Sequence, residues 1–159
     1  MNDEVSFGVM PREAMAAYSG LDFLRAMIAG RFPAAPIGET MGFLLVEAEP
    51  GKAVFEGRSS PAMLNPLGFI HGGWALTLID SAAGCALHTE LEAGFGYTTV
   101  ETKVNFVRPI APEGAVVRCE GRVLSRGRQI ATAEAKLESA DGKLLAHGTS
   151  TLIILPPRS

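Results

Sequence analysis

The chain has 159 residues, of which 47% are hydrophobic and 19% are charged, and this composition suffices for one globular domain with a sizeable core. Its formal net charge is −3, with both signs interspersed and no basic block, so nucleic acid is not an expected partner. No apolar run approaches the roughly 20 residues that span a bilayer, and the acidic N-terminus lacks the pattern of a secretory signal. We therefore expect no membrane association and predict a cytoplasmic location.

The first forty residues predict helices. Residues 11–20 begin with a proline, which is favourable at the first helical position, and end at Gly20, which we expect to stop the helix. Residues 21–33 repeat large apolar side chains at helical spacing before a glycine and a proline. We therefore predict an N-terminal helical cover over residues 1–37 and a main domain over residues 38–155.

A strand pair and a long helix are predicted next. Residues 40–49 and 52–60 read as two strands that are joined by a Pro-Gly turn. Residues 72–89 form the longest helical candidate, and its apolar residues leave no broad polar stripe. We expect this helix to be buried nearly all round.

Four segments with a period of two follow, over residues 97–108, 115–125, 128–139 and 143–155. In the third segment, small apolar residues alternate with polar ones, so the inner face of the sheet should carry small side chains. Such a sheet can bury the long helix only by curling around it. The predicted fold class is therefore α+β, with a curled antiparallel sheet of about six strands around one central helix.

Asp80 interrupts the apolar helix, and burying a carboxylate is costly unless it has a partner. It is a candidate for proton transfer or nucleophilic attack, against the alternative of a structural aspartate bonded to Ser81, Thr77 or a strand backbone. Gly72 and Gly73 begin the helix and offer unpaired amides at the positive end of its dipole, where an oxyanion would be stabilised. The alternative is that both glycines only form a tight turn.

These residues belong to a wider pattern. Asn65, His71-Gly72-Gly73 and Asp80 at these spacings, followed by the strand motifs over 97–110 and 121–137, resemble the PaaI-like acyl-CoA thioesterases of the hotdog fold. The resemblance covers about residues 38–155 and leaves the N-terminal helical extension unexplained. It implies hydrolysis of an acyl-CoA or related pantetheine thioester, with coenzyme A as part of the substrate and without a metal or cofactor.

The resemblance also implies a role for each residue of the motif. Asp80 is the nucleophile or general base, and the Gly72 amide, with Gly73 beside it, polarises the thioester carbonyl. Asn65 and His71 orient water or substrate, although His71 could also be a simple capping or core histidine. Thr99 is expected to support the catalytic water, with Thr98 as the alternative if the strand register differs by one residue.

The sequence also allows other nucleophiles, functions and pocket residues. Cys85 and His88 lie three residues apart on the predicted helix and could form a nucleophilic dyad, but an apolar setting keeps a thiol inert, so Cys85 and Cys119 are read as reduced core residues. A hotdog enoyl-CoA hydratase or dehydratase and a non-catalytic acyl-thioester binding module remain alternative functions. Phe69, Met63 and Trp74 could line an acyl pocket or simply belong to the core.

Coenzyme A carries phosphates, and basic residues at strand ends could meet them. Arg108, and Arg126 and Arg128 on either side of Gly127, are candidates for charge-assisted bonds, against the alternative of solvated loop arginines. Gly72 and Asp80 are eight residues apart, which corresponds to about 12 Å along a helix. One carbonyl could not contact both, so we predict a homodimer with shared active sites, which could pair further into a tetramer.

Overall fold

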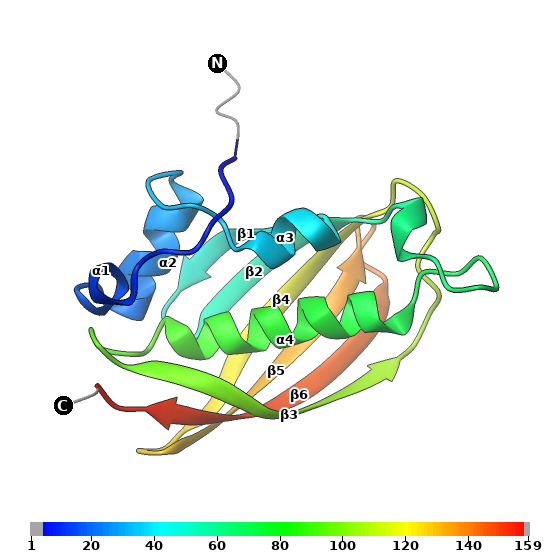
Figure 1. Cartoon of the computed structure of the whole chain (residues 1–159). Helices are drawn as coiled ribbons and strands as arrows, with labels where there is room; N and C mark the ends of the chain where they lie inside the picture. The colour runs from blue at the N-terminus through cyan, green and yellow to red at the C-terminus, as the bar shows by residue number, and fades with distance from the viewer. Residues whose placement is uncertain (1–4, 158–159) are drawn as a thin grey trace.

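The structure is a computed structural model that describes residues 5–157. Its elements are α1 (Arg12–Ala16), α2 (Gly20–Ile28), α3 (Pro36–Met41), β1 (Phe43–Glu49), β2 (Lys52–Arg58), a 3₁₀ turn (Pro61–Met63), α4 (Gly72–His88), β3 (Gly96–Phe106), β4 (Val116–Arg126), β5 (Ile130–Ser139) and β6 (Leu144–Leu155). The strands form one antiparallel sheet in the order β1-β2-β4-β5-β6-β3. Figure 1 shows this sheet curling around α4. The predicted α+β fold class is confirmed.

Small residues on the inner face of the sheet let α4 lie close against it. Ala131, Ala133 and Ala135 of β5 are buried under the helix, as their alternation predicts. A Cβ atom on Gly121 of β4 would collide with the backbone of Ala82 in α4. Any larger residue at this point would therefore push the helix away from the sheet.

One face of α4 stays partly open, so the expectation that the helix is buried nearly all round is wrong for that face. Trp74 and Leu78 are fully buried, but Leu76 is 37% exposed. Thr77, Asp80 and Ser81 are half-buried, and their spacing places them along the same side of the helix as Leu76. The sheet covers the opposite side, which leaves this stripe with less cover.

The N-terminal region contains three helices, and two of the predicted boundaries are wrong. Gly20 does not stop a helix. It begins α2, where it donates its N–H to Leu91 O (2.9 Å), and its Cα packs against the backbone carbonyl of His88. The strand predicted from residue 40 begins only at Phe43, because the preceding residues form α3.

Proline and glycine explain the existence of α3. Pro36 is its first residue and Gly42 ends it in the left-handed region with φ of 65°, which is the usual pair of start and stop signals. The helix crosses the predicted division between residues 37 and 38, and that division remains a prediction. Within residues 5–157, no helix is long and apolar enough to cross a membrane.

Candidate active site

Asp80 lies in the middle of α4 and is held by a hydroxyl relay from the sheet. Thr102 Oγ1 of β3 donates to Asp80 Oδ1 at 3.1 Å, and Ser150 Oγ of β6 lies 2.9 Å from Thr102 Oγ1. Because Thr102 has a single hydroxyl proton, Ser150 must donate to Thr102 when Thr102 donates to Asp80. Thr77 instead donates to Gly73 O at 2.8 Å. One carboxylate oxygen of Asp80 is thus oriented by the sheet.

A β-bulge in β3 brings Thr102 to Asp80. The pairing of β3 with β6 shifts register between Thr99 and Glu101, so the alternation of inward and outward side chains is reversed there. Without the bulge, Glu101 rather than Thr102 would follow Thr99 on the inner face. The sequence pattern does not point to Thr102, because a strict period of two does not locate a bulge.

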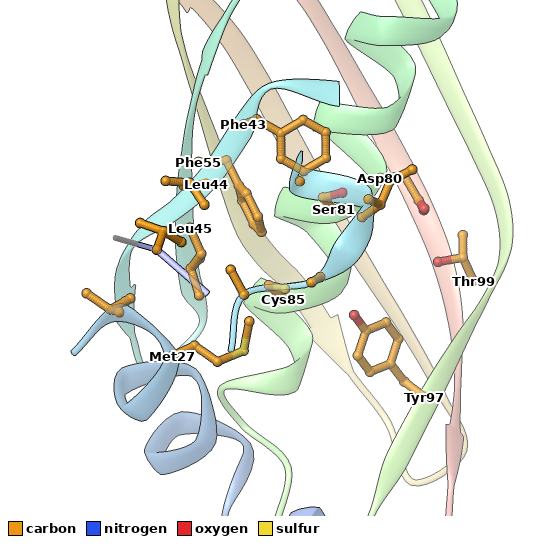
Figure 2. Close-up of a pocket in the computed structure, with 16 residues that line it drawn as sticks. Met27, Phe43, Leu44, Leu45, Phe55, Asp80, Ser81, Cys85, Tyr97 and Thr99 are labelled. Atoms are coloured by element: carbon orange, nitrogen blue, oxygen red, sulfur yellow. The ribbon is translucent and has the colours of Figure 1, made fainter. Parts of the chain in front are cut away.

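The two threonines named from the sequence lie on opposite faces of β3. Thr99 lines a pocket together with Asp80, whereas Thr98 is exposed and outside that pocket. Figure 2 shows Thr99 and Asp80 on the same side of the pocket. The structure therefore brings Thr99, but not Thr98, next to the carboxylate within one chain.

The start of α4 leaves one amide unpaired. His71 is the N-cap, and its Nδ1 accepts from the Gly73 N–H at 2.9 Å. The Gly72 N–H has no hydrogen-bond partner among residues 5–157, and the ring of Phe106 packs against Gly72 Cα. An accepting Nδ1 leaves the proton of a neutral imidazole on Nε2. His71 thus caps the helix, its role toward water or substrate remains a prediction, and the Gly72 amide stays free among the described residues.

Asn65 shapes the loop that precedes this helix start. Its Oδ1 accepts from the backbone N–H groups of Leu67 (2.9 Å) and Phe69 (3.2 Å). These bonds form an Asx-type turn, which fixes the path of the loop toward His71. Its role toward water or substrate remains a prediction.

A pocket of about 330 Å³ lies beside Asp80, between α4, β1, β3 and the N-terminal helices. Asp80, Ser81 and Cys85 line it from α4, and Tyr97 and Thr99 line it from β3 (Figure 2).

The three apolar residues considered for an acyl pocket are not part of this wall. Trp74 is a core residue whose Nε1 donates to Met41 O at 2.7 Å. Met63 packs against the core, and Phe69 is exposed.

Cys85 and His88 do not form a dyad. Burial raises the pKa of the Cys85 thiol to about 12, and the neighbouring Tyr97 offsets this rise only in part. Burial lowers the pKa of His88, whose Nδ1 has no partner within the described part of the chain. The His88 ring instead packs near Tyr97 and Phe23. The interpretation of Cys85 as an inert thiol is supported.

Replacement of Cys85 by serine should therefore leave an active protein. A serine has nearly the shape of cysteine and replaces the thiol by a hydroxyl, so we expect turnover to fall by less than about tenfold, whereas loss of a nucleophile costs about 10³-fold or more. Steady-state thiol release measures this directly. A folded Cys85→Ser protein without activity would restore the thiol as a candidate nucleophile.

The basic residues named from the sequence lie at opposite ends of α4. Arg108 lies near the start of the helix, because it follows β3, whose Phe106 contacts Gly72. The Arg108 guanidinium donates to Leu144 O at 2.8 Å. Arg126 reaches past the other end of the helix, donates to Glu90 O and pairs with Glu92 at 3.0 Å.

Arg128 is exposed on the tight turn that contains Gly127, whose N–H donates to Ile130 O at 2.8 Å. One chain thus does not gather the three arginines. Within residues 5–157, no group of three or more His, Cys, Asp or Glu side chains is arranged to hold a metal ion.

Comparison with known proteins identifies the family. Residues 67–146 match the thioesterase superfamily. Human acyl-coenzyme A thioesterase 13 is 31% identical over 130 residues, which cover 80% of this chain and 91% of the human protein. A phenylacetic acid degradation-related protein from Ralstonia eutropha JMP134 has a TM-score of 0.74 and is 28% identical, over 82% of this chain and 98% of that one.

The PaaI protein of E. coli, from the phenylacetic acid degradation operon, has the same fold. Its TM-score is 0.70 and it is 20% identical, over 76% of this chain and 85% of that one. These matches agree with the curled sheet and the long helix. The chain belongs to the thioesterase superfamily and is a PaaI-like thioester hydrolase of the hotdog fold.

Proposed function

We propose that this protein hydrolyses an acyl-CoA or related pantetheine thioester to the free acid and the thiol, with coenzyme A as part of the substrate and no cofactor. The observation that carries the proposal is Asp80, a carboxylate oriented by Thr102 at the wall of an otherwise largely apolar pocket. An acyl thioester has the matching form, because an apolar acyl group ends in a polar, reactive carbonyl. The name of the human relative supports the coenzyme A ester.

Asp80 acts as nucleophile or general base in this proposal. As a base it takes a proton from water, the resulting hydroxide attacks the carbonyl carbon, and the C–S bond breaks as the thiolate takes up the proton. As a nucleophile it forms an anhydride with the acyl group and expels the thiolate, and water then hydrolyses the anhydride. The bond from Thr102 leaves the second oxygen of Asp80 available for either step.

The Gly72 amide is the proposed donor to the carbonyl oxygen, and it belongs to the partner subunit's copy of the helix. Asp80 and Gly72 of one helix are about 12 Å apart along its axis. The edge strand β3 supports pairing of two copies, because its outer side has no neighbouring strand in the sheet. Val100 and Phe106 on this strand are 58% and 60% exposed. If two copies pair through this edge, the Gly72 amide of each subunit would serve the Asp80 of the other, and the dimer would contain two equivalent sites.

A screen over acetyl-, phenylacetyl-, decanoyl- and palmitoyl-CoA tests this function through release of free thiol. Crotonyl-CoA belongs in the same screen, because loss of its enoyl absorbance without thiol release is the result expected of a hydratase. Binding without either reaction is the result expected of a non-catalytic module. The geometry disfavours the hydratase, since His71 Nδ1 is already bonded to the Gly73 N–H.

Arg128 is the proposed contact for the phosphates of coenzyme A, together with Arg126. Conversion of both residues to alanine should raise KM for CoA esters by about tenfold and spare KM for a pantetheine ester, which lacks the nucleotide phosphates. Arg128→Ala alone leaves the ion pair between Arg126 and Glu92 intact, so it separates the loss of a phosphate contact from the loss of that ion pair. Equal increases for both substrates would remove the phosphate assignment.

A further inference from the structure

The pocket beside Asp80 has two chemically different sides. Asp80, Ser81, Thr99 and Tyr97 place their polar groups on the side formed by α4 and β3. The opposite side contains only apolar side chains, among them Met27, Leu44 and Leu45 (Figure 2). No cationic side chain among the described residues lines the pocket. A ligand that fits has a reactive polar end and an uncharged, apolar remainder.

The N-terminal helices supply much of the apolar side. Seven of the sixteen lining residues come from residues 5–38, and these residues precede the segment that matches the thioesterase superfamily. Met27 and Ile28 come from the end of α2, whereas Ala35 and Ile37 come from the start of α3. This part of the wall therefore lies outside the matched segment, as β1 and β2 also do.

Hydrogen bonds fix the wall in place. The Gly8 N–H donates to Ala34 O at 2.9 Å and the Ala34 N–H donates to Ser6 O at 2.8 Å, which ties the segment before α1 to the segment before α3. Arg25 Nε donates to Ala48 O of β1 at 3.2 Å, and the Gly20 N–H donates to Leu91 O at 2.9 Å. Because both ends of α2 are anchored, Met27 forms a preformed boundary.

The volume limits the ligand. An apolar cavity of about 150 Å³ accepts benzene. The pocket of about 330 Å³ is roughly twice that size, and it is bounded opposite Asp80 by Met27 and its neighbours. A short acyl group would leave much of it empty, whereas a long fatty chain would meet the wall.

We propose that the N-terminal helices form the far wall of the acyl pocket, and that Met27 and Ala35 set the upper size limit for an uncharged, medium-sized acyl group. The inference rests on the proposed hydrolysis, in which the reacting carbonyl lies at Asp80. It assigns the N-terminal cover a function in substrate selection. Carboxylate-bearing acyl groups such as succinyl are excluded, because the pocket offers no cation and Asp80 repels them.

Two substitutions with opposite effects test the wall. Met27→Ala shortens the boundary and should raise the ratio of kcat/KM for palmitoyl-CoA over hexanoyl-CoA by about tenfold. Ala35→Leu adds bulk at an exposed residue before α3 and should lower the ratio for decanoyl-CoA over acetyl-CoA by about tenfold. Met15→Ala is the matched control, because Met15 belongs to α1 and does not line the pocket.

Ratios that stay within about twofold of the wild-type values in folded Met27→Ala and Ala35→Leu proteins would overturn the proposal. So would an equal change in Met15→Ala, since that result means that the cover acts only through general stability. Calorimetric binding of non-hydrolysable thioether analogues of the same chains separates the two proposals. If the variants shift the chain-length preference for binding but no thiol is released, hydrolysis is refuted and the proposal for the wall stands. If thiol is released but the preference does not shift, the proposal for the wall is refuted and hydrolysis stands.

Discussion

Asp80→Asn should lower turnover by about 10³-fold or more while the protein stays folded. An amide oxygen can still accept the hydrogen bond from Thr102, so the relay from Ser150 is kept. The substitution removes the negative charge that either takes a proton or attacks carbon. Thiol release under saturating substrate measures the loss, and the melting temperature should stay within about 3 °C of the wild-type value.

Asp141→Asn is the matched control for this experiment. Asp141 is an exposed carboxylate that pairs with Lys143 at 2.7 Å, in the turn between β5 and β6. Its replacement should change turnover by less than about twofold, because Asp141 does not line the pocket beside Asp80 and an exposed ion pair contributes little to stability. An Asp80→Asn protein that keeps more than about a tenth of wild-type turnover would exclude Asp80 from the chemical step.

Mixing two inactive proteins should restore about a quarter of wild-type activity if active sites are shared between subunits. Asp80→Ala removes the carboxylate, and Gly72→Pro removes the amide at the first helical position, where proline is tolerated. His71 has ψ of 133°, which suits a residue before proline. After random exchange, each heterodimer contains one site with an intact Gly72 and an intact Asp80.

Gly72→Ala separates the loss of the amide from added bulk. Alanine and proline both add a Cβ atom, which would lie 2.9 Å from the Phe106 ring. Alanine keeps the backbone N–H, whereas proline removes it. The close contact is with the far end of the Phe106 side chain, and the ring must shift in the same way in both variants, so the comparison isolates the amide. Gly72→Ala should thus retain far more activity than Gly72→Pro. No recovery after denaturation, mixing and refolding of proteins that demonstrably exchange subunits would refute the shared site.

Local patterns in the sequence were sufficient for the elements and for the main chemical candidates. The alternation of Ala131, Ala133 and Ala135 with polar residues predicted both the strand and its small inner face. The glycine pair predicted the start of α4, and Asp80 was conspicuous as a carboxylate on an apolar helix. These signals are local, because they depend on side-chain period and on backbone groups at a helix end.

Only the tertiary structure decided which groups meet Asp80. Thr102 reaches it because a bulge reverses the alternation in β3, and Met27 faces it across a pocket because α2 packs against the end of α4. Arg108 and Arg126 were equivalent as basic residues at strand ends, yet they lie at opposite ends of the helix. Strand register, bulges and packing between distant segments depend on contacts across the whole fold, and sequence periodicity does not encode them locally.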